Sequence, residues 1–166
     1  MTEPAAVDQR TFRDVMGTFA TGVTVVTLNV DGDPRGMTAN AVMSLSLDPP
    51  LVVVSVQTAG TMHELFQRAE SFGVNILASD QRPQSDLFAS HGDPEEPMGG
   101  FPFRIGVSGV PLLEGTIGFA ECRIMEAVVG GDHTLFIGEA LDVGFGEDAE
   151  PLLFHRGKYR LLGGEG

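Results

Sequence analysis

Two long, partly alternating apolar segments, 116–128 and 133–143, are separated only by a short turn. The turn contains Gly130, Gly131 and Asp132, which are typical of a tight hairpin connection because they tolerate positive backbone φ angles. Both segments are therefore predicted to be strands of one hairpin. A doubly wound parallel sheet requires regular alternation of strands and helices, which the second half of the chain lacks. The pattern favours a fold built mainly from β-hairpins.

Shorter segments of the same kind predict further strands. They are rich in valine, threonine, leucine or phenylalanine, are bounded by turn residues, and span residues 23–30, 51–56, 71–77 and parts of 152–162. Asp31 and Gly32 follow the first of these segments and form a strong hairpin signal, with a return strand expected over 35–37.

Three short helices are predicted among the strands. Asp8 is a candidate N-cap for the first, which presents Phe12, Val15, Met16 and Phe19 on one face. The second spans 61–68 with Thr61 as its N-cap, and the third lies within 79–89. Many strands with a few helices predict a mainly β fold, a barrel with helical decoration. No repeat or linker divides the chain, so residues 1–166 are expected to form a single domain.

The composition limits the possible partners. The 166 residues are 42% hydrophobic with a formal net charge of -13, so we expect a folded protein that repels nucleic acid. The acidic clusters at 93–96 and 147–150 are expected to be solvated loops. No run of about 18 apolar residues predicts a membrane span, and the first ten residues lack the features of a signal peptide. A cytoplasmic location, with no membrane partner, is therefore expected.

Residues of reactive types give few leads by themselves. Cys122 is the single cysteine, which excludes an intramolecular disulfide and suits a reducing compartment, and its place in an alternating run predicts a core residue. The four histidines form no HxH or HxxxH pair, so no metal site is expected. His63 and His91 are expected at the surface.

The segment GMTANAVM, residues 36–43, places small and hydroxyl-bearing residues where a plain barrel would have bulky core side chains. Small side chains leave room, so backbone N–H groups and hydroxyls can face a ligand. The chain has neither the GxGxxG fingerprint nor a Walker-type glycine loop, so a nicotinamide cofactor would not be bound by a Rossmann unit.

Six segments with family-like spacing carry a resemblance. They lie at residues 12–27, 36–41 (GMTANA), 44–51 (SLSLDPPL), 72–78 (FGVNILA), 131–134 (GDHT) and 151–159. This series resembles the flavin reductase-like family, which has the FMN-binding split-barrel fold. It is similar to the small reductase components of two-component flavin monooxygenases, over residues 10–162.

The resemblance implies a mainly β split barrel that forms a homodimer. It implies reduction of FMN or FAD by NADH or NADPH, with reduced flavin supplied to a partner monooxygenase. The choice between the two flavins, and between the two nucleotides, stays open. Two other functions also stay open, because one fold hosts many activities: a flavin-binding electron carrier or store without reductase activity, and a structural barrel without a cofactor.

The resemblance also implies a set of flavin-binding residues. Those of the polar segment and of the strand that follows it would contact the flavin ring and ribityl chain, and Gly60 and Thr61 at a helix start would suit the phosphate. Arg82 or Arg68 would balance its charge. The full set is Met37, Thr38, Ala39, Asn40, Ala41, Ser44, Ser46, Ser55, Val56, Gln57, Gly60, Thr61, Arg82 and Phe88, with Asn75 in the same pocket wall.

Asp132, His133 and Thr134 match the family motif that lies near the nicotinamide. His133 is the candidate catalytic residue, expected to tune nucleotide binding more than hydride transfer, which needs close stacking of two rings and no general base. The simpler interpretation is that His133 only occupies a hairpin turn and has no role in nucleotide binding. Tyr159 is expected to touch the nucleotide, together with its neighbours His155, Arg156 and Lys158.

The loop 92–103 is rich in proline, glycine and acidic residues. Two interpretations remain open for it, a lid over the flavin or a wrap on the surface. Phe101 and Phe103 can accordingly stack on a ring or anchor the loop.

Overall fold

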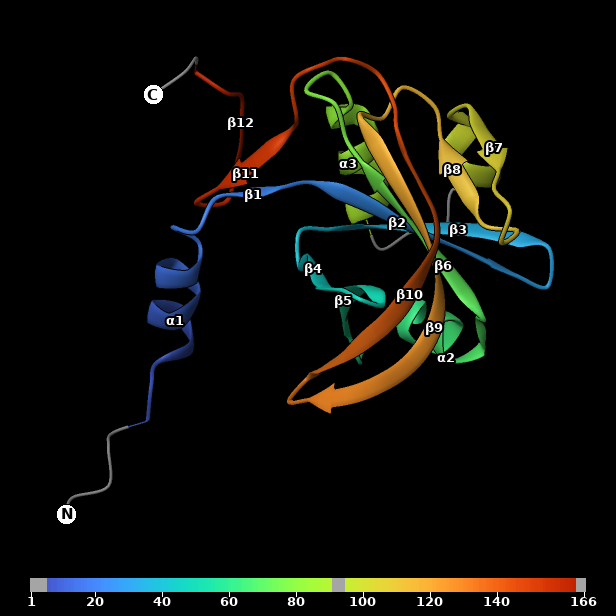
Figure 1. Cartoon of the computed structure of the whole chain (residues 1–166). Helices are drawn as coiled ribbons and strands as arrows, with labels where there is room; N and C mark the ends of the chain where they lie inside the picture. Colours follow the sequence, from blue (N-terminus) through green and yellow to red (C-terminus); the bar gives the residue numbers. More distant parts are fainter. Residues whose placement is uncertain (1–5, 91–94, 164–166) are drawn as a thin grey trace.

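A computed structural model describes residues 6–90 and 95–163 and shows a mainly β fold, as predicted (Figure 1). The helices are α1 (Gln9–Met16), α2 (Thr61–Arg68) and α3 (Arg82–Ala89), with a 3-10 turn η1 (Pro97–Gly100). The strands are β1 (Thr21–Gly22), β2 (Thr24–Val30), β3 (Asp33–Ala39), β4 (Val42–Leu47), β5 (Pro50–Gln57), β6 (Ser71–Ile76), β7 (Phe103–Ile105), β8 (Pro111–Leu113), β9 (Gly118–Gly130), β10 (His133–Phe145), β11 (Leu153–His155) and β12 (Lys158–Arg160).

Seven of these strands form one antiparallel sheet in the order β3-β2-β6-β9-β10-β5-β4. Its two edge strands, β3 and β4, are consecutive in the chain, and only Asn40 and Ala41 lie between them. Three Cα–Cα steps, from Ala39 to Val42, span at most about 11 Å, so the sheet has to curl until its edges approach each other. No ladder joins β3 to β4 within the described residues, so the barrel is split along this seam.

The predicted hairpin turns are present. Asp31 and Gly32 both have positive φ angles, 55° and 81°, which is the geometry of the turn type that matches strand twist. Gly131 has a φ of 65° in the turn between β9 and β10, and these two strands pair along their whole length. The two turns set the register of the four strands they join.

The interior of the barrel is closed by α2. Its Phe66 packs against Phe72 of β6 and Phe136 of β10, with ring centroids 5.9 and 4.6 Å apart. The helix spans 61–68 as predicted, but the predicted cap is wrong: Gly60 is the N-cap, and no side chain caps the helix. Thr61 is thus the first helical residue. Cys122 lies in the same core, fully buried, and burial and the charge of Glu121 raise its pKa to about 12.

Asn75 joins elements of the fold and does not line the predicted pocket. Its side chain is fully buried in β6, donates to the carbonyl of Val25 (2.9 Å) and accepts the N–H of Leu113 (2.7 Å). These bonds tie β8 to the barrel, and the β7–β8 hairpin covers the second face of β6 (Figure 1). A buried amide with its groups paired in this way is not available to a ligand.

Glu121 is a second buried polar anchor. Its carboxylate accepts the N–H of Val107 (3.1 Å) and both the N–H (2.8 Å) and the O–H (2.6 Å) of Ser108. Three donors of the β7–β8 turn thus depend on one side chain of β9. Such charge-assisted bonds are stronger than neutral ones.

The part of the loop 92–103 that the structure describes is anchored on the barrel. Met98 is buried in a second core cluster, and Phe101 and Phe103 pack against it. Residues 91–94, which include His91 and part of the acidic cluster, lie outside the described residues. The two phenylalanines therefore act as anchors, and from residue 95 onward the loop wraps the surface.

Replacing Glu121 by alanine leaves three donors of the β7–β8 turn without their acceptor. We expect a loss of about 2 to 3 kcal/mol in the free energy of unfolding, and a smaller loss for Glu121→Gln, whose amide oxygen still accepts. Chemical denaturation measures both. Glu126→Gln, on an exposed position of the same strand, is the matched control and should stay within about 0.5 kcal/mol of the parent chain. Equal stability of the alanine and control variants would contradict this role.

Candidate functional site

The predicted site residues gather along the seam between β3 and β4. The N–H of Ser55 donates to the carbonyl of Ala41 (3.0 Å), which brings the end of β5 against the polar segment. On the other side of β5, Gln57 pairs with His133, the first residue of β10. Residues 41–43 thus lie beside the end of β5, and the start of β10 lies on the other side of that strand, although the three are not consecutive in the sequence.

Several polar side chains on this seam are unused by the protein. Asn40, Ser44 and Gln57 are exposed and Ser46 is half-buried, and in the described ranges none of their side chains makes a hydrogen bond to another residue. Amides and hydroxyls offer both donors and acceptors. This donor set fits a ligand with many neutral polar groups, such as the ring edge and ribityl chain of a flavin.

A second group of predicted residues is used to hold α3 against β3. Thr38 donates its O–H to the carbonyl of Ser85 (2.6 Å), and the Ser85 hydroxyl bonds the hydroxyl of Tyr159 (2.8 Å). The guanidinium of Arg82 lies 5.0 Å from the Tyr159 ring centre and pairs with Asp86 at 3.3 Å. Burial raises the pKa of Tyr159 above its usual value, so its hydroxyl stays protonated near neutral pH. The C-terminal hairpin is thereby connected to the polar segment.

Four other predicted residues have side chains packed in the two core clusters. Ala39 and Val56 are buried in the barrel core, on which the half-buried Met37 packs, and Phe88 is buried in the second core cluster. A ligand on the seam can reach them only through their backbone. Gly36 is required here because a Cβ would stand 2.9 Å from the Phe88 ring.

The two candidate phosphate cations are placed differently. Arg68 is in the last turn of α2, about 10 Å along the helix from Gly60 and Thr61, and pairs with Asp31. It is therefore too far from the helix start to bind a phosphate there, and that prediction is wrong. Arg82 is exposed near Tyr159. The start of α2 keeps unpaired N–H groups in its first turn, as every helix start does.

His133 has a defined orientation. Its Nδ1 lies 2.8 Å from a carboxylate oxygen of Asp132, and this hydrogen bond, followed by the charge of His133, lowers the pKa of Asp132. A carboxylate only accepts, so Nδ1 carries the proton and Nε2 is left for another partner. The Nε2 of a neutral imidazole can accept a hydrogen bond from an amide, such as the carboxamide of a nicotinamide.

The sequence interpretation missed two residues next to this motif. His63 is half-buried instead of exposed, and its Nε2 lies 2.9 Å from the hydroxyl of Thr134. Thr58 donates both its N–H and its O–H to the carbonyl of Asp132, each at 3.0 Å. The signal for His63 was its position three residues before Phe66, which puts both side chains on one face of α2.

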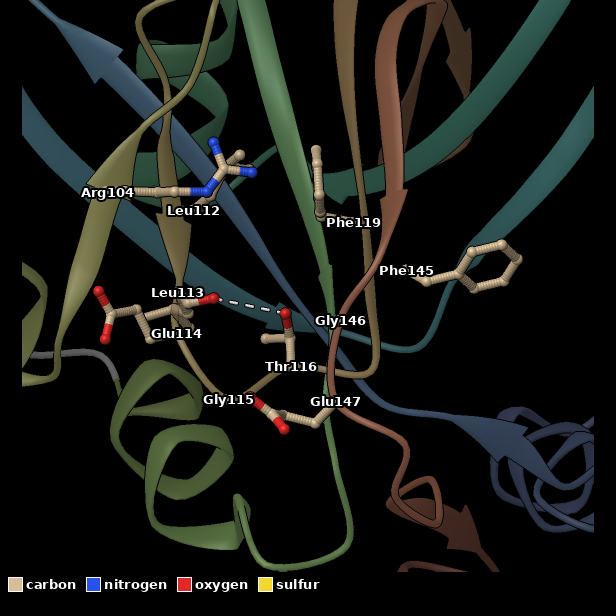
Figure 2. A pocket seen from close by; sticks show the side chains of 10 residues that line it. All are labelled: Arg104, Leu112, Leu113, Glu114, Gly115, Thr116, Phe119, Phe145, Gly146 and Glu147. Atoms are coloured by element: carbon tan, nitrogen blue, oxygen red, sulfur yellow. Dashed lines mark hydrogen bonds between the residues drawn. The ribbon is translucent and has the colours of Figure 1, made fainter.

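A separate recess lies away from the seam. About 330 Å³ in volume, it is bordered by the β7–β8 hairpin and the end of β10, with Arg104, Thr116 and Phe145 among its lining residues (Figure 2). None of the predicted site residues lines it. Glu114 and Glu147 also line it and make it unfavourable for a phosphate-bearing ligand.

Two further observations concern the described residues alone. They contain no group of three or more histidine, cysteine, aspartate or glutamate side chains that can hold a metal ion. Among them, helices that are long and apolar enough to cross a membrane are also absent.

Comparison with known proteins places the chain in a family. Residues 16–163 match the family described as flavin reductase like domain, so the chain belongs to the flavin reductase-like family that its motifs indicated. The solved structure of the flavin reductase PheA2 in its native state superposes with a TM-score of 0.87 at 42% identity, covering 95% of this chain and 100% of that one. The split-barrel fold is thereby confirmed.

Two curated relatives are informative about activity. The FMN reductase (NADH) SmoA of Agrobacterium fabrum is 38% identical over 94% of this chain and 87% of its own length. The reductase subunit HsaB of a flavin-dependent monooxygenase from Rhodococcus jostii is 34% identical over 93% of this chain and 78% of its own.

Substitutions of Asn40 and Glu147 distinguish flavin binding at the seam from flavin binding in the recess. Asn40→Ala removes an exposed amide that no described residue uses, so we expect flavin affinity to fall about fivefold with an unchanged melting temperature. Glu147→Gln in the recess should leave the affinity unchanged. Quenching of flavin fluorescence on titration measures both. The reverse pattern would move the flavin from the seam to the recess.

Proposed function

We propose that this chain reduces FMN or FAD with NADH or NADPH and supplies the reduced flavin to a partner monooxygenase. The activity belongs to a single domain that spans residues 1–166. The observation that carries the proposal is the juxtaposition of Gln57 with His133, which brings the polar seam and the nucleotide motif to one end of the barrel. Because SmoA is named for NADH, NADH is the favoured reductant.

The flavin supplies the redox chemistry, since its ring accepts the hydride of the nicotinamide. The protein binds and orients the two rings. Asn40, Ser44 and Gln57 offer the free polar groups for the flavin, and His133 presents Nε2 to the nucleotide. Tyr159 and Arg82 form the outer border of the seam, where the rest of a dinucleotide would lie.

The activity is tested by nicotinamide absorbance, with NADH or NADPH and with or without FMN or FAD. We expect oxidation of the nucleotide only when flavin is present. His133→Ala should raise the KM for the nucleotide about tenfold, because the variant loses its ring acceptor, while flavin affinity is unchanged. Failure to consume either nucleotide with either flavin rejects the reductase and leaves a flavin carrier. Unchanged KM and kcat in the variant reject the role of His133.

We further propose that the protein is a homodimer. Phe12, Val15 and Phe19 of the α1 region are each at least 59% exposed, and α1 stands apart from the barrel (Figure 1). The outer edge strand β4 is also apolar, with Met43 at 56% and Leu47 at 89% exposure. Apolar surface of this extent is typical of an interface, and a second copy supplies a matching surface because a two-fold axis pairs like with like.

Charge on the α1 face should separate the subunits. We expect the parent chain to sediment at twice the chain mass and Val15→Asp to sediment as a monomer, because a buried unpaired carboxylate opposes association. Gln9→Glu, on an exposed polar position of the same helix, is the matched control and should remain dimeric. A parent chain that sediments as a monomer at micromolar concentration would reject the dimer.

A monooxygenase partner and a cytoplasmic location complete the proposal. HsaB is the reductase subunit of a flavin-dependent monooxygenase. The similarity of this chain to HsaB supports a monooxygenase partner for this chain as well. A free, buried cysteine suits a reducing compartment that also holds reduced nicotinamide nucleotides.

A further inference from the structure

We propose that His63 is a positioning residue for the nucleotide: it fixes the turn that carries His133 relative to the flavin seam. The inference rests on the proposed reductase function and assigns a role to a side chain that contacts neither the seam nor the His133 ring. Its basis is the hydrogen bond between His63 Nε2 and the Thr134 hydroxyl, at 2.9 Å.

His63 is held in place from two sides. It lies in the first turn of α2, and its ring packs edge-on against Phe136, with ring centroids 5.9 Å apart. Thr134 is buried, so the bond is shielded from competing water. A half-buried imidazole that contacts a core ring and a buried hydroxyl is therefore well ordered.

Thr134 and His133 are neighbours in β10 and face opposite sides of the sheet, because successive side chains alternate along a strand. Fixing Thr134 on the inner side therefore fixes the direction of His133 on the outer side. Asp132 sets the rotation of the His133 ring through the bond at Nδ1. The two bonds together determine where Nε2 points.

The same stretch of chain connects the turn to the flavin seam. Thr58 binds the carbonyl of Asp132 through both its N–H and its O–H, and Gly60 begins the helix that carries His63. Gln57, on the seam, pairs directly with His133. The segment 57–63 therefore contacts the turn at Asp132, His133 and Thr134, so flavin and nucleotide groups share one rigid support.

Apart from the strand ladder and the two hydrogen bonds from Thr58, the β9–β10 turn has little support. The residues at its tip, from Val128 to Asp132, are exposed, and the hairpin extends beyond the barrel (Figure 1). Without the His63 bond the strand keeps its ladder but loses its one side-chain hydrogen bond to α2 within the described residues. The expected result is a looser start of β10 and a less exact position of His133.

Three substitutions test the role. His63→Phe keeps a ring against Phe136 and loses the hydrogen bond, His63→Gln keeps a polar group that can bond Thr134, and Thr134→Val removes the hydroxyl at nearly constant volume. We expect His63→Phe and Thr134→Val each to raise the KM for NADH about fivefold, with kcat at saturation and flavin affinity nearly unchanged. His63→Gln should restore most of the affinity. The double variant should be no worse than either single one, because the two remove the same bond.

Hydrogen exchange of the amides of residues 132–135 is the readout that does not depend on activity. It should be faster in His63→Phe and Thr134→Val than in the parent chain, at equal melting temperature. An unchanged KM in these variants overturns the proposal, as does a KM that rises only together with a fall in melting temperature and is not restored by glutamine. If the parent chain oxidises no nucleotide, the reductase function itself is rejected. If the parent chain is active and the His63 variants behave like it, only the positioning role of His63 is rejected.

Discussion

The fold depends on one constraint of chain length: Asn40 and Ala41 alone connect the two opposite edges of a seven-stranded sheet. So short a connection cannot cross an open sheet, so the sheet has to curl around its own core. The place where the edges meet is also where regular pairing stops. Polar groups that a closed barrel would use for itself are therefore left over at the seam, which is where the proposed site lies.

The polar residues predicted from the sequence then divide into two kinds. The hydroxyl groups of Thr38 and Tyr159 form hydrogen bonds with Ser85, and Asn75 is buried with its amide paired. Asn40, Ser44 and Gln57 make no such bond within the described part of the chain. The first kind holds α3, β8 and the C-terminal hairpin around the seam, and the second kind lines it. The same residue types thus serve the fold or the site according to which partners the topology brings near them.

Local signals explain why much of the fold was predictable. Turn residues such as Asp31 with Gly32, and Gly131, act through their own backbone angles, so their effect needs no distant partner. The bounds of α2 were also predictable from local sequence signals. Its N-cap was not, because Gly60 begins the helix without any side-chain hydrogen bond. The structural roles of Asn75, Glu121 and His63 were not predicted, because each acts through partners on other elements, between 13 and 71 residues away in the sequence. The hydrogen-bond partner of His63, Thr134, is 71 residues downstream, and only the barrel brings the two together.

The candidate site and the proposed dimer surface share β4 but otherwise lie on different elements. The seam is supported from within the protomer, through α2 on one side and α3 on the other. Exposed apolar residues occur on α1 and β4, and also on β9 and β10, and the α1 face makes no contribution to the core. However, β4 borders the seam with Ser44 and carries Met43 and Leu47 on its exposed surface. A second copy that packs on β4 would therefore stiffen the flavin side of the seam, while His63 stiffens the nucleotide side. On this view the protein orients two mobile rings by supporting the flavin side and the nucleotide side of the proposed site separately.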